Sequence, residues 1–418
     1  MRMLGLELRR ILKTKITIIL LAATLVLTVV MAYLPVTFVS SSYVNTEGQV
    51  VEITGREAIS YKKKIQKEIA GEITGEDVQK AVRQYQECLS KYGATETYEL
   101  PEGVYETEIL PYAPLLHGIR EAFADSETGI APSIMNISVE KVADFYDICE
   151  ERIKSLMKME QRDHPEAQQD AIEMYAQVKK PYEFYPGYNT DAMDYQLLLS
   201  FIIMVISVVI AAPVFSSDYQ TGADDILRCT KYGKMKLAAV KIVSVLLISG
   251  IIYTVCMSLY LIVSNLLFGW ECTETSVQIL YSIINLVKMN IGELQIYVAV
   301  TGLLAVLATV TLALFLSSRF KNVVVSLGTA LMICILPVVL DIALPTDIAP
   351  WFYAILPSSG VGILTSILYA LLDFVYLSVG KVSVWLPHVM IGVVIVEIPV
   401  LVFGIVRNYT GYSERQGN

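Results

Sequence analysis

Six long apolar runs constrain this chain more than any other feature of its sequence. They begin near residues 16, 195, 242, 294, 322 and 387. The length of each run is close to the roughly 20 residues that a helix needs to cross a bilayer. Only 17% of the residues are charged and the mean hydropathy is +0.54, which excludes an ordinary soluble domain. The first run is too long for the apolar part of a signal peptide, so we expect a retained span.

We therefore predict an α-helical polytopic membrane protein with six transmembrane helices and a mostly helical extracytoplasmic domain inserted between helices 1 and 2. The expected layout is an amphipathic helix over 1–15, a first span over 16–38, the inserted domain over 39–192, a second span over 193–215, a cytoplasmic loop over 216–237, and spans 3 to 6 over 238–418. This last part includes a segment at about 348–380, which we expect to enter the outer leaflet without crossing it.

The distribution of charge predicts the orientation in the membrane. Residues 40–190 hold 27 acidic and 16 basic side chains, and the rest of the chain holds 14 and 16. Of the latter 16 basic residues, all but Lys288 and Lys381 lie at ends of spans that this layout places inside. Because cytoplasmic loops are enriched in Lys and Arg, we expect a plasma-membrane protein with both termini cytoplasmic. A seventh crossing would move Arg407 and Arg415 outside. No stretch indicates nucleic-acid binding.

The loop between the second and third apolar runs is short and polar. Its second half, together with the start of the next run, holds five basic residues: Arg228, Lys231, Lys234, Lys236 and Lys241. Its first half is acidic, with Asp218, Asp224 and Asp225. An acidic start and a basic end suit the dipole of a short helix. We therefore expect a short cytoplasmic helix that contacts water or a partner.

Sequence motifs for common enzymatic chemistry are absent. The chain has no Walker A motif, no H-E-x-x-H and no G-x-S-x-G, so neither ATP binding by that route nor a common hydrolase mechanism is predicted. Its three histidines and six cysteines are too dispersed for a recognisable metal site. We expect a chain that is not an enzyme and needs no cofactor.

Glu397 lies near the middle of the last apolar run, two residues before Pro399. An ionisable group at that depth costs about 2.5 kcal/mol or more on insertion scales, and it usually faces the interior of the bundle. Two interpretations follow. Glu397 lines a substrate or ion path near a proline kink, or it is a hydrogen-bonded or protonated packing residue.

Cys88 and Cys149 each lie on a helical apolar stripe of the inserted domain. On the extracytoplasmic side a disulfide between them is chemically allowed. Two reduced, half-buried thiols fit the same pattern equally well. The sequence does not decide between the two states.

The layout and the loop resemble a known family, the permease subunits of ABC transporters of the type 2 exporter class. The resemblance rests on the basic amphipathic N-terminus, the six-span order and the loop over 215–241. The family often has Glu-x-x-x-Gly in this loop, and this chain has Asp218 and Gly222 at that spacing. The inserted domain opens with Y-V-x-x-x-G from Tyr43, followed by G-R-E-A, which is similar to large-loop Firmicute-type permeases.

The resemblance implies a separate ABC ATPase subunit that docks on the loop and hydrolyses ATP. A second permease copy, identical or related, would complete a path across the lipid bilayer. The docking residues that it implies are Asp218, Gly222, Asp224, Asp225, Leu227, Arg228 and Tyr232. Among the family's substrates, the bulky outer domain favours an antimicrobial peptide, a drug or another amphiphile. A sodium exporter that uses Glu397 is a subsidiary alternative.

Two other classes of protein fit the layout. A membrane receptor or sensor would bind a ligand with the acidic outer domain, although its only inward parts are one short loop and two short tails. An intramembrane enzyme would need a partner for Glu397, and the sequence indicates none. An associated ATPase would favour the exporter, whereas an associated kinase alone would favour the sensor.

Overall fold

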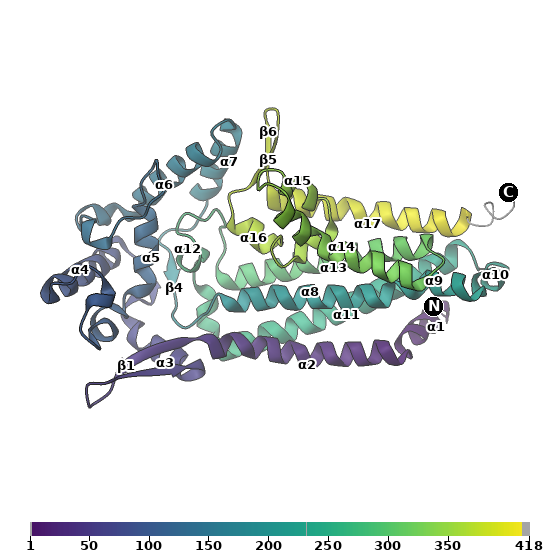
Figure 1. Cartoon of the computed structure of the whole chain (residues 1–418), viewed down its shortest axis with the longest axis horizontal. Helices are drawn as coiled ribbons and strands as arrows, with labels where there is room; N and C mark the ends of the chain where they lie inside the picture. The colour runs from purple at the N-terminus through teal and green to yellow at the C-terminus, as the bar shows by residue number, and fades with distance from the viewer. Residues whose placement is uncertain (1, 231, 412–418) are drawn as a thin grey trace.

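The structure is a computed structural model that describes residues 2–230 and 232–411. Lys231 and Arg415, which enter the charge pattern above, lie outside these described residues. The molecule is elongated, with a bundle of long helices at one end and a lobe of shorter helices at the other (Figure 1). Helix α1 (Arg2–Leu12) and the last turns of α17 (Leu386–Gly411) lie at the same end of the molecule, far from that lobe.

Six described helices are long and apolar enough to cross a membrane, and their number equals the number of spans that the sequence predicts. They are α2 (Lys15–Phe38), α8 with α9 (Asp191–Thr221), α11 (Met235–Phe268), α13 (Ile291–Arg319), α14 (Val323–Ala343) and α17. Several extend beyond their predicted bounds because the helix continues past its apolar part. Helix α11 has 34 residues and is therefore about 51 Å long, against a hydrocarbon core of about 30 Å.

Helices α8 and α13 form the centre of the bundle. In each, 61% of the most apolar stretch is buried, against 22% in α2 and α14 and 17% in α17. Helix α13 contacts α8, α11 and α17. The α11–α13 crossing requires Gly302, because a Cβ there would lie 2.3 Å from the hydroxyl of Tyr253. The peripheral helices present apolar faces that suit lipid or another membrane protein.

The lobe, hereafter the insert, is formed by residues 39–190 between α2 and α8 and is mostly helical, as predicted. It opens with an antiparallel hairpin in which β1 (Ser40–Val44) pairs with β2 (Val50–Thr54). Its α-helices are α3 (Gly55–Ile65), α4 (Gly75–Tyr92), α5 (Ala113–Ala122), α6 (Phe145–Glu160) and α7 (Pro165–Ala176). A short antiparallel pair links β3 (Gly71–Glu72), which follows α3, to β4 (Glu183–Phe184) near the end of the insert.

The insert packs directly on the loop between α11 and α13. The carboxylate of Glu121 accepts hydrogen bonds from the Ser282 hydroxyl (2.6 Å) and the Ile283 amide (2.8 Å). The Tyr182 hydroxyl donates to the Ile283 carbonyl at 3.0 Å. One apolar core includes side chains of the insert, of this loop and of the start of α13. The insert therefore covers one end of the bundle, hereafter the insert end.

The segment between α14 and α17 folds as short pieces and contains no further long helix. They are α15 (Ala349–Tyr353), η7 (Pro357–Val361), α16 (Ile367–Leu372) and a hairpin of β5 (Tyr376–Val379) with β6 (Val382–Trp385). The hairpin was not predicted from the sequence; it turns at Gly380, which has a φ of 61°. Entry of this segment into the outer leaflet stays a prediction.

Candidate functional site

The loop between α8 and α11 lies at the end of the bundle away from the insert, hereafter the loop end (Figure 1). Helix α9 (Pro213–Thr221) continues from α8, and α10 (Ala223–Arg228) follows it. Gly222 joins them with a φ of 69°, a left-handed backbone conformation that residues with a side chain rarely adopt. Helix α10 is the short helix that the charge order predicts, with Asp225 in its first turn and Arg228 in its last.

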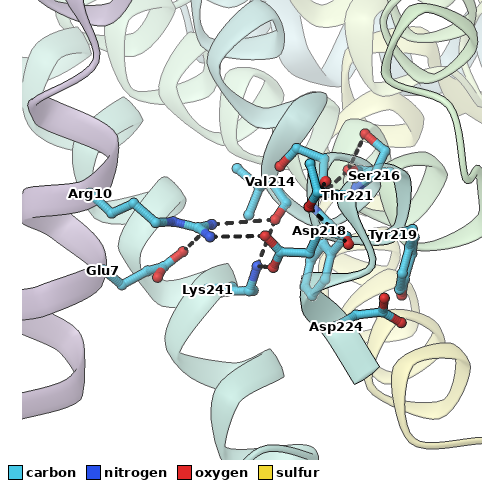
Figure 2. A network of polar contacts seen from close by, with 12 residues as sticks. Glu7, Arg10, Val214, Ser216, Asp218, Tyr219, Thr221, Asp224 and Lys241 are labelled. Atoms are coloured by element: carbon cyan, nitrogen blue, oxygen red, sulfur yellow. Dashed lines mark hydrogen bonds and ion pairs between the residues drawn. The ribbon is translucent and has the colours of Figure 1, made fainter. Parts of the chain in front are cut away.

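Four charged side chains form a cluster at the loop end, hereafter the charge cluster: Glu7, Asp218 and Lys241, which are buried, and Arg10, which is partly exposed (Figure 2). The ammonium of Lys241 in α11 is 0% exposed and donates to the Asp218 carboxylate and to the Val214 carbonyl (2.7 Å). Arg10 of α1 donates to the other oxygen of Asp218 at 3.1 Å and pairs with Glu7 at 2.6 Å. Two cations and two anions therefore balance one another between three helices.

The charge cluster holds α9 in a fixed place. Moving an ion out of water costs several kcal/mol, so buried ions persist where opposite charges and hydrogen bonds compensate them. Each oxygen of Asp218 faces a cationic donor. On the side of α13, the Ser317 hydroxyl accepts from the amides of Phe215 (3.0 Å) and Ser216 (3.1 Å). Helix α9 is thus bonded to α1, α11 and α13.

Arg228 holds α10 against its neighbours, and Asp224 pairs with Arg228 inside α10. Asp224 is 3% exposed, and its carboxylate lies 3.6 Å from the Arg228 guanidinium. That guanidinium also lies over the ring of Tyr409 in α17, at 4.4 Å, and over the ring of Tyr219 in α9, at 5.8 Å. Burial raises the pKa of Asp224 and so does the neighbouring Asp225, whereas Arg228 lowers it.

The other side of the loop is exposed and partly apolar. Ile226 is 74% exposed, Met235 65% and Tyr232 46%. Asp225 lies beside Ile226 and is also exposed. These four residues, hereafter the loop surface, combine apolar and charged groups on a loop whose inner side is bonded to the helices. Such a combination is typical of a surface that binds another protein.

The docking residues predicted from the sequence differ in their solvent exposure. Three are exposed (Gly222, Asp225 and Tyr232), two are half-buried (Leu227 and Arg228) and two are buried (Asp218 and Asp224). The buried pair positions the loop from inside, while the exposed set can meet a partner. The contact of Arg10 with Asp218 was not predicted from the sequence. The signal for Lys241 was its place directly before a long uncharged stretch of α11, where an ammonium needs a buried partner.

Glu397 lies in α17, two residues before Pro399. Its side chain is half-buried, and its Oε2 atom has neither solvent contact nor a hydrogen-bond partner within the described ranges. Just beyond it, Gly404 lies against the ring of Phe315 in α13. Glu397 is therefore on the side of a peripheral helix that packs toward the bundle. Its two predicted roles, on a transport path or in packing, both stay predictions.

Cys88 in α4 and Cys149 in α6 are free, so the disulfide considered for them is not formed. Both are buried in the apolar core of the insert, where a thiol packs as a small apolar group. Burial raises the pKa of Cys149 to about 12 and that of Cys88 to about 11. Across residues 2–230 and 232–411, no group of three or more His, Cys, Asp and Glu could hold a metal ion.

Comparisons with protein-family models, with curated proteins and with solved structures give no match for this chain. The fold itself defines the class: a mostly helical, multi-pass membrane protein with six long apolar helices. Its candidate site is the loop surface at one end of the bundle, supported from inside by the charge cluster.

Proposed function

We propose that the chain is the permease subunit of an ATP-driven exporter and that a separate ABC ATPase subunit docks on the loop surface. The observation that supports this most strongly is the two-sided construction of the loop. Its outer side exposes Ile226 and Tyr232, and its inner side contacts the long helices through Asp218, which pairs with Lys241 of α11, and through Arg228, which lies over Tyr409 of α17. A loop of this kind would pass a partner's movement directly to the spans.

In this proposal the loop end is cytoplasmic and the insert is extracytoplasmic. The concentration of Lys and Arg at the loop end supports this orientation. The position of α1 and of the end of α17 beside α10 agrees with two cytoplasmic termini (Figure 1). A second permease copy would cover part of the apolar faces of α2, α14 and α17 and complete the path.

The strength of the buried contacts supports a mechanical role for the loop. Asp218 joins α9 to α11 through Lys241 and to α1 through Arg10, and Arg228 joins α10 to α17. Breaking the buried Asp218–Lys241 pair would cost about 3–5 kcal/mol, whereas the partly exposed Arg10–Asp218 pair is worth about 1 kcal/mol or less. Movement of an ATPase on ATP binding would therefore displace several spans together and bias them between two arrangements.

The first test of this proposal uses Ile226→Asp in the full-length chain, purified together with a co-expressed ABC ATPase subunit. The substitution adds a charge to the exposed side and leaves the charge cluster intact. We expect at least a tenfold loss of bound ATPase and of its stimulated ATP hydrolysis. Val379→Asp is the matched control, because Val379 is 67% exposed on the hairpin at the insert end.

Wild-type amounts of ATPase bound to the Ile226→Asp variant would contradict docking on the loop surface. Failure of any ATPase to bind the wild-type chain would contradict the permease assignment itself. A kinase found in its place would favour the receptor. Substrate screening, beginning with amphiphilic peptides and drugs, follows from the positive result.

A further inference from the structure

A cleft of ≈ 600 Å³ lies between the insert and the segment that precedes α17. One wall is the end of α6 and the turn into α7; the other is formed by residues 346–351 and 373–378. Figure 1 shows α7, α15 and the β5–β6 hairpin close to one another in this region. Pockets for small ligands have volumes of about 300–1,000 Å³ and are frequent where two parts of a protein meet.

Hydrogen bonds across the cleft hold its walls in place. The Gln161 side-chain amide donates to the Phe374 carbonyl at 3.4 Å. The Tyr376 hydroxyl donates to the Asp170 carboxylate at 3.1 Å, and Tyr376 itself is 8% exposed. Helix α7 also contacts β6. The cleft therefore exists without a ligand, so binding would require little rearrangement.

The charged side chains of the cleft are almost all acidic. Glu160, Asp347 and Asp373 line it, with His164 as its single basic side chain, and neither Lys nor Arg is present. Within the described part of the chain, none of these three carboxylates forms an ion pair. The surface of Asp373 is exposed, yet partial desolvation of its carboxylate raises the pKa of Asp373, and the nearby Asp341 raises it further.

Aromatic side chains lie among these carboxylates. Trp351 of α15 is 41% exposed and Phe374 is half-buried, and both line the cleft. Faces of aromatic rings attract cations, most strongly when the cation is organic and weakly hydrated. The carboxylates are not grouped as metal ligands in the described ranges. The lining therefore suits a bulky organic cation better than a metal ion.

We propose that this cleft binds an amphiphilic organic cation, with its positive group near Asp347 and Asp373 and its apolar body against Trp351. This binding site does not depend on the docking of an ATPase, because it lies at the opposite end of the molecule from the loop surface. In an exporter with the orientation proposed above, the cleft would face the outer side of the membrane.

The test uses tetraphenylphosphonium, a bulky aromatic cation, and tetraphenylborate, an anion of nearly the same shape. Equilibrium dialysis with the full chain in nanodiscs, corrected for empty nanodiscs, measures binding of each ion. We expect saturable binding of the cation, at least tenfold tighter than that of the anion. The double variant Asp347→Asn, Asp373→Asn should weaken cation binding at least tenfold, and Trp351→Ala should weaken it several-fold.

The matched control is Glu127→Gln, Glu151→Gln, which removes two carboxylates from another hollow of the insert. We expect cation binding within twofold of the wild type in this control. Absence of saturable cation binding, equal binding of the two ions, or wild-type binding by the Asp347→Asn, Asp373→Asn variant would each overturn the proposal. Size-exclusion profiles show whether each variant is folded. We expect the Asp347→Asn, Asp373→Asn variant to fold, because both aspartates are exposed.

Discussion

At Asp218, one carboxylate accepts hydrogen bonds from cations of two different helices, Arg10 in α1 and Lys241 in α11. Neither Asp218 nor Lys241 can exchange its partner for water, because both are buried. The free energy of this contact therefore depends on both partners being present. A single neutral substitution would leave an ammonium buried without its counter-ion.

We predict that Asp218→Asn lowers the free energy of unfolding by about 3 kcal/mol, because it leaves Lys241 uncompensated. The thermal unfolding midpoint of the chain in detergent measures this loss. Asp225→Asn, on the exposed face of the same loop, is the control and should leave the midpoint unchanged. Adding Lys241→Met to Asp218→Asn should restore part of the loss. A wild-type midpoint for Asp218→Asn alone would show that the charge cluster does not stabilise the loop end.

Among the elements, the crossing of α11 and α13 depends on one close approach. Gly302 leaves room for the Tyr253 hydroxyl, which lies 3.1 Å from the Ser200 hydroxyl of α8. The three central helices therefore meet at a single point. An added methyl group there would displace the tyrosine and break its hydrogen bond.

Gly302→Ala should destabilise the bundle by about 1–3 kcal/mol, the usual cost of overpacking. Gly328→Ala in α14 is the control, since a Cβ there would meet no atom within 4 Å among the described residues. Thermal unfolding in detergent compares the two. Because the closest contact is with the hydroxyl, Gly302→Ala combined with Tyr253→Phe should recover stability relative to Gly302→Ala. No difference between the two alanine variants would contradict this account of the crossing.

The long helices could be predicted from the sequence, whereas contacts between distant residues could not. Six spans were predictable because crossing a bilayer demands long apolar helices, and this demand is local in sequence. The face of α10 that turns inward was not predictable, since it depends on Arg228 meeting Tyr409 of a distant helix. The contact of Arg10 with Asp218 joins residues 208 positions apart. The β5–β6 hairpin is too short for its alternation to stand out.

On the scale of the whole molecule, docking of an ATPase requires the loop end to be cytoplasmic. A native cysteine reports on this end. All six cysteines lie within the described ranges; Cys229, just after α10, is exposed and the others are buried. Its thiol can therefore be labelled selectively without engineering the chain.

A membrane-impermeant maleimide should label Cys229 only after the cells are permeabilised. The matched control carries Ser126→Cys with Cys229→Ser and places the exposed thiol on the insert. That variant should react in intact cells. Reaction of Cys229 in intact cells would reverse the orientation and place the loop surface outside, where no ATPase could reach it.

The most direct test of the central claim is photocrosslinking from Cys229 in native membranes. A benzophenone maleimide attached to this thiol reaches only proteins that contact the loop surface. We expect one major adduct, whose partner has the Walker A motif that this chain lacks, and loss of that adduct in Ile226→Asp. Adducts with lipid alone, or with a protein that has no ATP-binding motif, would contradict the docking of an ATPase on this loop.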